Sequence, residues 1–236
     1  MLFDLRGRGR QRTVKVVYIT LAFLLGGGLV LFGIGGDVSG GLVDAITERT
    51  GGSDENTDRL RARERSLERR VQANPQDTQA LAELARVRVQ LAGQGDNFDP
   101  ETNSYTDDGL AELRQADQAW QRHLQAAERP DDRVASLMVQ AYAALNDLTK
   151  ATRAQEVVAE ARDSAGAYAQ LAALAYQAGQ TRTGDLARKA ALERTDEDMR
   201  EALKGQLDQA KQQATLESLQ SGEQPPTTPT PSPDDG

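Results

Sequence analysis

The sequence predicts an all-α protein in which one N-terminal transmembrane helix precedes an α-solenoid of about eight helices. Three observations lead to this prediction. Residues 16–36 form an uncharged, apolar stretch. The remaining chain is rich in alanine, the best helix former, whereas the aromatic residues that favour strands make up only 4% of the chain. Short helical patterns also alternate with turn signals from residue 57 to residue 219, as is typical of repeat proteins.

Residues 16–36 are long enough to cross a bilayer. These 21 residues carry no charge, and as a helix they would extend about 31 Å, close to the thickness of the hydrocarbon core. Five basic residues and one acid lie in residues 1–15, whereas Asp37 and Asp44 follow the stretch. The positive-inside rule therefore places the N-terminus in the cytoplasm and the bulk of the chain outside it. With the Arg- and Ala-rich composition, this indicates the inner membrane of a bacterium.

A cleavable signal peptide is the alternative interpretation of the same stretch. Signal peptides also combine a basic start with an apolar segment, but that segment usually has about 7–15 residues and ends at a small-residue cleavage site. Residues 16–36 are longer and end in glycines without such a site. The sequence therefore favours a permanent anchor in the lipid bilayer.

Composition divides the rest of the chain into three parts. Residues 37–56 are rich in Gly, Ser and Asp, so we expect a flexible linker. Residues 57–219 form the helical domain, which an insertion with loop chemistry interrupts at residues 95–109. Residues 220–236 are rich in Pro and Thr and cannot form a core, so we expect a disordered tail.

Turn signals such as Asn74-Pro75 and Gly179 separate eight candidate helices within the domain. The candidates cover residues 58–73, 77–92, 109–128, 132–145, 148–162, 165–178, 181–194 and 196–219. Their short and even lengths are typical of an array of helix pairs.

Small and large apolar residues recur within these helices at a spacing of thirty-three residues. Met138-Val139 and Ala151 form one copy of the pattern, and Leu171-Ala172 and Gly184 form the next. A third copy opens at Asn74-Pro75. The small residues would allow paired helices to touch, while the large residues fill the remaining space.

In these motifs the chain resembles the tetratricopeptide-repeat (TPR) family, in its membrane-anchored bacterial form. The resemblance covers residues 57–219, although the early tryptophan of each repeat is absent and Arg88 stands where a tyrosine is usual. It implies a groove, lined by the first helix of each pair, that binds a protein or peptide partner. In that register we expect six residues to face the groove: Arg86, Gln90, Arg133, Gln140, Tyr176 and Gln177.

No residues in the sequence indicate an enzyme, a cofactor or a metal site. Cysteine is absent, His123 is the only histidine, and no nucleophile or orienting carboxylate is signalled beside it. We therefore expect His123 to be a packed or half-exposed residue without a catalytic role. Four residues are spaced somewhat like the ligands of a calcium loop: Asp99, Glu101, Asn103 and Asp107. The glycine and the final glutamate of that loop are missing, which favours a solvated turn.

The distribution of charge along the chain indicates whether nucleic acid or anionic lipid is an expected partner. The overall net charge is −8 although residues 1–15 are basic, so the body of the chain is acidic and would repel nucleic acid. The arginine-rich run 59–70 is expected to be a solvated helix face, with contact to anionic lipid headgroups as the second interpretation.

Together these features predict a membrane-anchored TPR scaffold or adaptor that binds a protein or peptide partner on the extracytoplasmic side, in envelope assembly or protein secretion. The alternative is a structural homo-oligomer in the membrane, with no separate peptide ligand.

Overall fold

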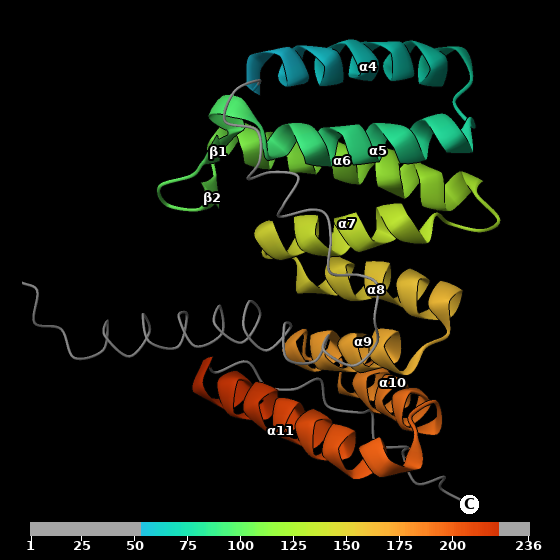
Figure 1. Cartoon of the computed structure of the whole chain (residues 1–236), viewed down its shortest axis with the longest axis vertical. Coiled ribbons are helices and arrows are strands. Elements are labelled where there is room, and N and C mark those ends of the chain that lie inside the picture. The colour runs from blue at the N-terminus through green and yellow to red at the C-terminus, as the bar shows by residue number, and fades with distance from the viewer. Residues whose placement is uncertain (1–52, 222–236) are drawn as a thin grey trace, which may run out of the picture. The chain divides into compact units, whose positions relative to one another are not determined.

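The computed structural model describes residues 53–221 of the chain (Figure 1). The predicted basic segment 1–15, the predicted span 16–36, most of the predicted linker and nearly all of the predicted tail lie outside these residues. Among the helices that are described, none is both long enough and apolar enough to cross a membrane.

Helices make up most of the described residues, which confirms the predicted all-α class. Their bounds are α4 Ser53–Ala73, α5 Thr78–Ala92, α6 Asp107–Ala126, α7 Asp132–Ala144, α8 Leu148–Arg162, α9 Ala165–Gln177, α10 Thr181–Glu193 and α11 Glu197–Ser221. Between α5 and α6 lie the 3-10 helix η2 (Gly95–Asn97) and the strands β1 (Phe98–Asp99) and β2 (Ser104–Tyr105).

Short polar side chains set the starts of most helices. Each accepts a hydrogen bond from a backbone N–H of the first turn, which has no partner within the helix. These caps are Asp77, Thr106, Asp131, Asp147 and Ser164. Three turns between the described helices use a residue with left-handed backbone to reverse the chain: Asn146, Asp163 and Gly179.

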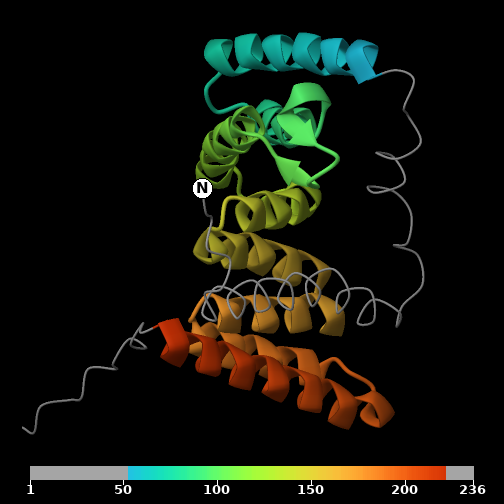
Figure 2. The ribbon, with the colours of Figure 1, turned by 90° about the vertical axis from the view of Figure 1, so that its left-hand side faces the viewer.

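The helices pack mainly in pairs: α5 with α6, α7 with α8, and α9 with α10. Helix α4 packs on α5, and α11 packs on α9 and α10. Figures 1 and 2 show these helices as successive layers in chain order, with α4 and α11 at the two ends of the series. Buried positions of α8 recur thirty-three residues later in α10: Ala151 and Gly184, Ala154 and Ala187, Val158 and Ala191.

Two clusters of buried apolar side chains lie inside this stack. The first extends from Leu67 to Val158 and contains Trp120. The second extends from Ala159 to Leu207. Small residues let helices approach closely, as at Gly184, where an added β-carbon would lie 2.4 Å from the ring of Tyr176.

The structure differs from the sequence-based expectation at the start of α4 and in the insertion between α5 and α6. Helix α4 begins at Ser53, inside the predicted linker; its first turn carries acids, and Glu55 pairs with Arg59 at 2.5 Å. The insertion 95–109 was expected to have loop chemistry throughout. It contains η2 and an antiparallel pairing of Phe98 with Tyr105, whose rings meet edge to face at 5.4 Å.

Candidate protein-binding face

The first helices of the three pairs, α5, α7 and α9, carry the residues that the sequence predicted for binding. The three helices are capped at equivalent positions by Asp77, Asp131 and Ser164. Helices α5 and α7 contact each other directly. The side chains of α5 and α7 that do not pack inside the stack therefore lie on one surface, which we call the first-helix face.

Arg86 of α5 is half-buried and already engaged. Its Nε donates to Glu83 at 2.9 Å, and a second nitrogen of the same guanidinium also contacts that carboxylate. Glu83 lies 2.5 Å from Arg63 of α4 as well. The hydrogen bonds to Glu83 raise the pKa of Arg86 and, with the charge of nearby Asp131, outweigh the effect of burial. Arg86 thus offers little free charge to a ligand.

Arg133 and Gln140 of α7 are both exposed to solvent. The backbone N–H of Arg133 donates to the capping Asp131 at 2.9 Å. Its guanidinium forms no ion pair with any of the residues that the structure describes. Arg133 is therefore the predicted residue best placed to attract an incoming carboxylate.

The other three predicted residues are less accessible. Gln90 and Gln177 are half-buried. Tyr176 is only 4% exposed: its ring packs against Gly184, and its hydroxyl donates to Asp185 at 2.8 Å. The structure places Tyr176 between α9 and α10, where it joins the two helices of one pair instead of facing solvent. Gly184 is the feature of the sequence that could have indicated this packing.

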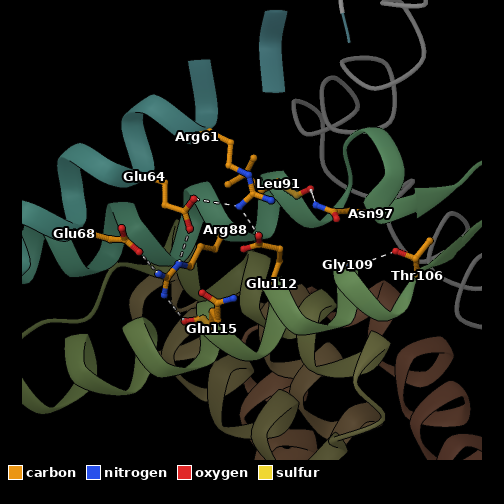
Figure 3. A network of polar contacts seen from close by, with 10 residues as sticks. All are labelled: Arg61, Glu64, Glu68, Arg88, Leu91, Asn97, Thr106, Gly109, Glu112 and Gln115. Atoms are coloured by element: carbon orange, nitrogen blue, oxygen red, sulfur yellow. Dashed lines mark hydrogen bonds and ion pairs between the residues drawn. The ribbon is translucent and has the colours of Figure 1, made fainter. Parts of the chain in front are cut away.

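A buried ionic network joins α4, α5 and α6 below the first-helix face (Figure 3). Arg88 Nε donates to Glu64 at 3.1 Å, Nη2 to Glu68 at 2.6 Å, and Nη1 to the carbonyl of Gln115 at 3.2 Å. Arg61 bridges Glu64 and Glu112. The sequence predicted only that Arg88 replaces a tyrosine; its role as a link between three helices was not expected.

A second polar cluster links α6, α7 and α8. Tyr142 donates its hydroxyl to Asp117 at 2.6 Å, and Lys150 donates to the other oxygen of Asp117 at 2.8 Å. Burial would raise the pKa of Asp117, but hydrogen bonds from Lys150, Tyr142 and Gln121 outweigh it and lower that pKa. Burial and the contact with Asp117 raise the pKa of Tyr142.

His123 is buried, which is the first of the two expected alternatives, packed or half-exposed. Nε2 accepts from the backbone N–H of Asp131 at 3.1 Å, so the proton lies on Nδ1, which donates to the carbonyl of Thr78 at 2.9 Å. Its ring stacks on Trp120 with centroids 5.2 Å apart. Both ring nitrogens thus connect backbone groups of different helices.

Acidic side chains do not gather into a site that could hold a metal ion within residues 53–221. In the insertion, Asp99 accepts from the backbone N–H of Glu101 at 2.8 Å and from the hydroxyl of Thr102 at 2.7 Å. These hydrogen bonds lower the pKa of Asp99, the contact with the Thr102 hydroxyl contributing most. This is the solvated turn that the sequence predicted.

A shallow hollow lies between α8, α9 and α10, away from the predicted residues. Tyr168, Leu171 and Leu186 line it together with Glu156 and Glu160. Burial and the neighbouring Glu160 raise the pKa of Glu156. Leu186 is 62% exposed, so this hollow adds an apolar area to the surface of the second helices.

Comparisons with protein-family models, with curated proteins and with solved structures found no match to this chain. The candidate site therefore rests on the geometry described above.

Proposed function

We propose that this chain is a membrane-anchored, TPR-like scaffold that binds a protein or peptide partner through the first-helix face. The anchor is the apolar stretch 16–36, and the bound segment lies on the extracytoplasmic side. The proposal gains support from the paired helices, from their equivalent caps and from the recurrence of buried small residues at thirty-three-residue spacing.

The observation that carries the binding proposal is the pair of exposed polar residues on α7. Arg133 has no acidic partner among the described residues, and Gln140 lies on the same helix with its side chain exposed. Arginine is prominent among the residues that dominate binding energy, and its planar group binds carboxylates with two hydrogen bonds. A partner segment that carries a carboxylate fits this surface.

Site-specific crosslinking in native membranes tests the proposal. A photo-crosslinking residue at Gln140 is expected to form an adduct with a defined partner. The same residue at Gln125, which is exposed on the second helix α6, serves as the matched control and is expected to form none. Adducts of equal yield at both positions would contradict a specific first-helix site.

The charge requirement is tested separately. Arg133→Ala is expected to reduce the adduct at Gln140, because the carboxylate of the partner loses its cation. Arg153→Ala, which removes an exposed arginine from the second helix α8, is expected to leave it unchanged. Adducts consisting only of two copies of this chain would instead support the homo-oligomeric alternative.

A further inference from the structure

The outer face of α4 is a second surface without a packing partner in the described part of the chain. One side of α4 packs on α5 through Leu67 and Val71. The opposite side consists of residues spaced three or four apart, as one helix face requires. All of them are exposed: Ala62, Arg65, Ser66, Arg69 and Ala73.

Some arginines of α4 form ion pairs with described residues, and others form none. Arg61 contacts the buried network, Arg63 lies 2.5 Å from Glu83, and Arg70 lies 2.9 Å from Asp77. Arg65 and Arg69, one helical turn apart on the outer face, form no ion pair with any residue in the range 53–221. The outer face therefore presents two free guanidinium groups, flanked by small side chains that would not hold a flat surface away.

The acids of this face lie at its N-terminal end. Glu55 is paired with Arg59 at 2.5 Å, and Asp58 is exposed. The half of the face that carries Arg65 and Arg69 is thus basic, although the chain as a whole has a net charge of −8.

Chain connectivity limits how far this face lies from the proposed anchor. Sixteen residues, 37–52, separate the stretch 16–36 from the start of α4. Sixteen residues span at most about 55 Å in any conformation. Helix α4 is also the end layer of the stack, so no described helix shields its outer face (Figure 2).

We propose that the outer face of α4 docks on anionic phospholipid headgroups through Arg65 and Arg69 and so holds the helical stack against the bilayer. Guanidinium groups bind phosphate with two parallel hydrogen bonds, and two such groups on one face match a surface of phosphates. The inference rests on the proposed membrane anchor, because the anchor keeps α4 close to lipid. Each arginine is expected to raise the docked population by about fivefold in an anionic bilayer.

The test uses the full chain, reconstituted into bilayers and selected by flotation. Because the chain has no cysteine, Ser66→Cys places a single fluorescent donor on the outer face of α4. Energy transfer to an acceptor on lipid headgroups is expected to be higher with phosphatidylglycerol than with phosphatidylcholine alone, and to fall as salt is added. A donor at Gln213→Cys, on α11, is expected to show no dependence on lipid charge.

Charge variants identify the residues responsible. Arg65→Glu with Arg69→Glu is expected to reduce energy transfer in the anionic bilayer to its level in the neutral one. Arg153→Glu with Arg182→Glu makes the same change in net charge on α8 and α10 and is expected to have no effect. An equal loss in both double variants would show a response to total charge and would overturn the docking.

Two further outcomes distinguish a failure of the proposed anchor from a failure of the proposed docking. A chain that does not float with the bilayer would contradict the anchor and, with it, this inference. A chain that floats, but whose energy transfer from α4 does not depend on lipid charge, would contradict the inference alone. Sodium phosphate and sodium chloride at equal ionic strength are expected to release α4 equally, and release by phosphate only would show recognition of free phosphate instead of a lipid surface.

Discussion

Arg88 and Tyr142 occupy equivalent positions on α5 and α7, each one eleven residues after the aspartate that caps its helix. Both are buried, and both reach polar groups on neighbouring helices. Tyr142 uses one hydroxyl, which donates to Asp117 at 2.6 Å. Arg88 brings a full charge into the stack, and Glu64 and Glu68 balance it. The stability of the stack at Arg88 thus depends on paired charges, and it is sensitive to the loss of either partner.

Arg88→Ala is expected to lower the free energy of unfolding by about 3 kcal/mol or more, because Glu64 would remain buried with less of its charge compensated. Arg86→Ala is the matched control on the same helix. The Arg88 side chain is 11% exposed, whereas that of Arg86 is 40% exposed. The control is therefore expected to cost no more than about 1 kcal/mol. Urea unfolding measures both, and equal losses would contradict the structural role of the network.

Asp117 is expected to contribute stability that depends on pH. Its folded-state pKa is lowered, so its contribution is complete above the unfolded-state pKa of about 3.9 and is lost as pH falls through the folded-state pKa. The difference in unfolding free energy between wild type and Asp117→Asn should therefore be largest at neutral pH and shrink below about pH 4. A difference that stays constant across this range would contradict the assignment.

At the scale of elements, the insertion between α5 and α6 is tied to the stack by its own polar groups. Asn97 donates to the carbonyl of Leu91 at 2.8 Å, and Thr106 donates its hydroxyl to the carbonyl of Asp96 at 2.9 Å. Thr106 also caps α6 by accepting from the N–H of Gly109 at 3.3 Å (Figure 3). The insertion is thereby positioned by hydrogen bonds, and Tyr105 also packs, partly buried, against the first apolar cluster.

Gly109 is the residue where this arrangement is most sensitive to an added side chain. A β-carbon there would lie 2.1 Å from the carbonyl oxygen of Asn97, so Gly109→Ala must displace the insertion and is expected to cost about 1–3 kcal/mol. Gly205→Ala in α11 meets no atom within 4 Å and is expected to stabilise the helix by about 1 kcal/mol. Changes of opposite sign in the free energy of unfolding, measured with urea, would support both assignments. A Gly109→Ala variant with unchanged stability would contradict the first.

At the scale of the whole described stack, most contacts between helices join neighbours in the chain, although α11 packs more on α9 than on α10. The two apolar clusters divide near the end of α8, and Trp120, the only tryptophan, lies in the first cluster. In such a linear arrangement stability is approximately a sum of local terms, so the two clusters need not unfold together.

Ala172→Glu tests this division. Ala172 is fully buried in the second cluster, so a carboxylate there would lack a partner and is expected to destabilise that cluster by about 3 kcal/mol or more. The urea transition followed by circular dichroism should shift, while the transition followed by Trp120 fluorescence should shift less. Ala173→Glu, at the half-buried neighbouring position, should have a smaller effect. Equal shifts with both probes would show a single cooperative unit.

The helices could be predicted because their signals are local. Periodic apolar residues mark each helix, and Asp131, Asp147 and Ser164 mark where three of them begin. The start of α4 at Ser53 was missed because its acidic first turn resembles linker composition. The pairing of Phe98 with Tyr105 was missed because two-residue strands leave no periodicity to recognise.

The sequence by itself determined the all-helical class and the order of the helices, since these depend on propensity, spacing and composition. Only the tertiary structure decided which polar residues of the first helices remain free. Arg86 and Arg133 look alike in the sequence, yet Glu83 neutralises Arg86 while Arg133 stays unpaired among the described residues. Tyr176 was expected to face a ligand, but it packs on Gly184. Such outcomes depend on contacts between helices, and periodicity along one helix carries no information about the charge or the space that its neighbour supplies.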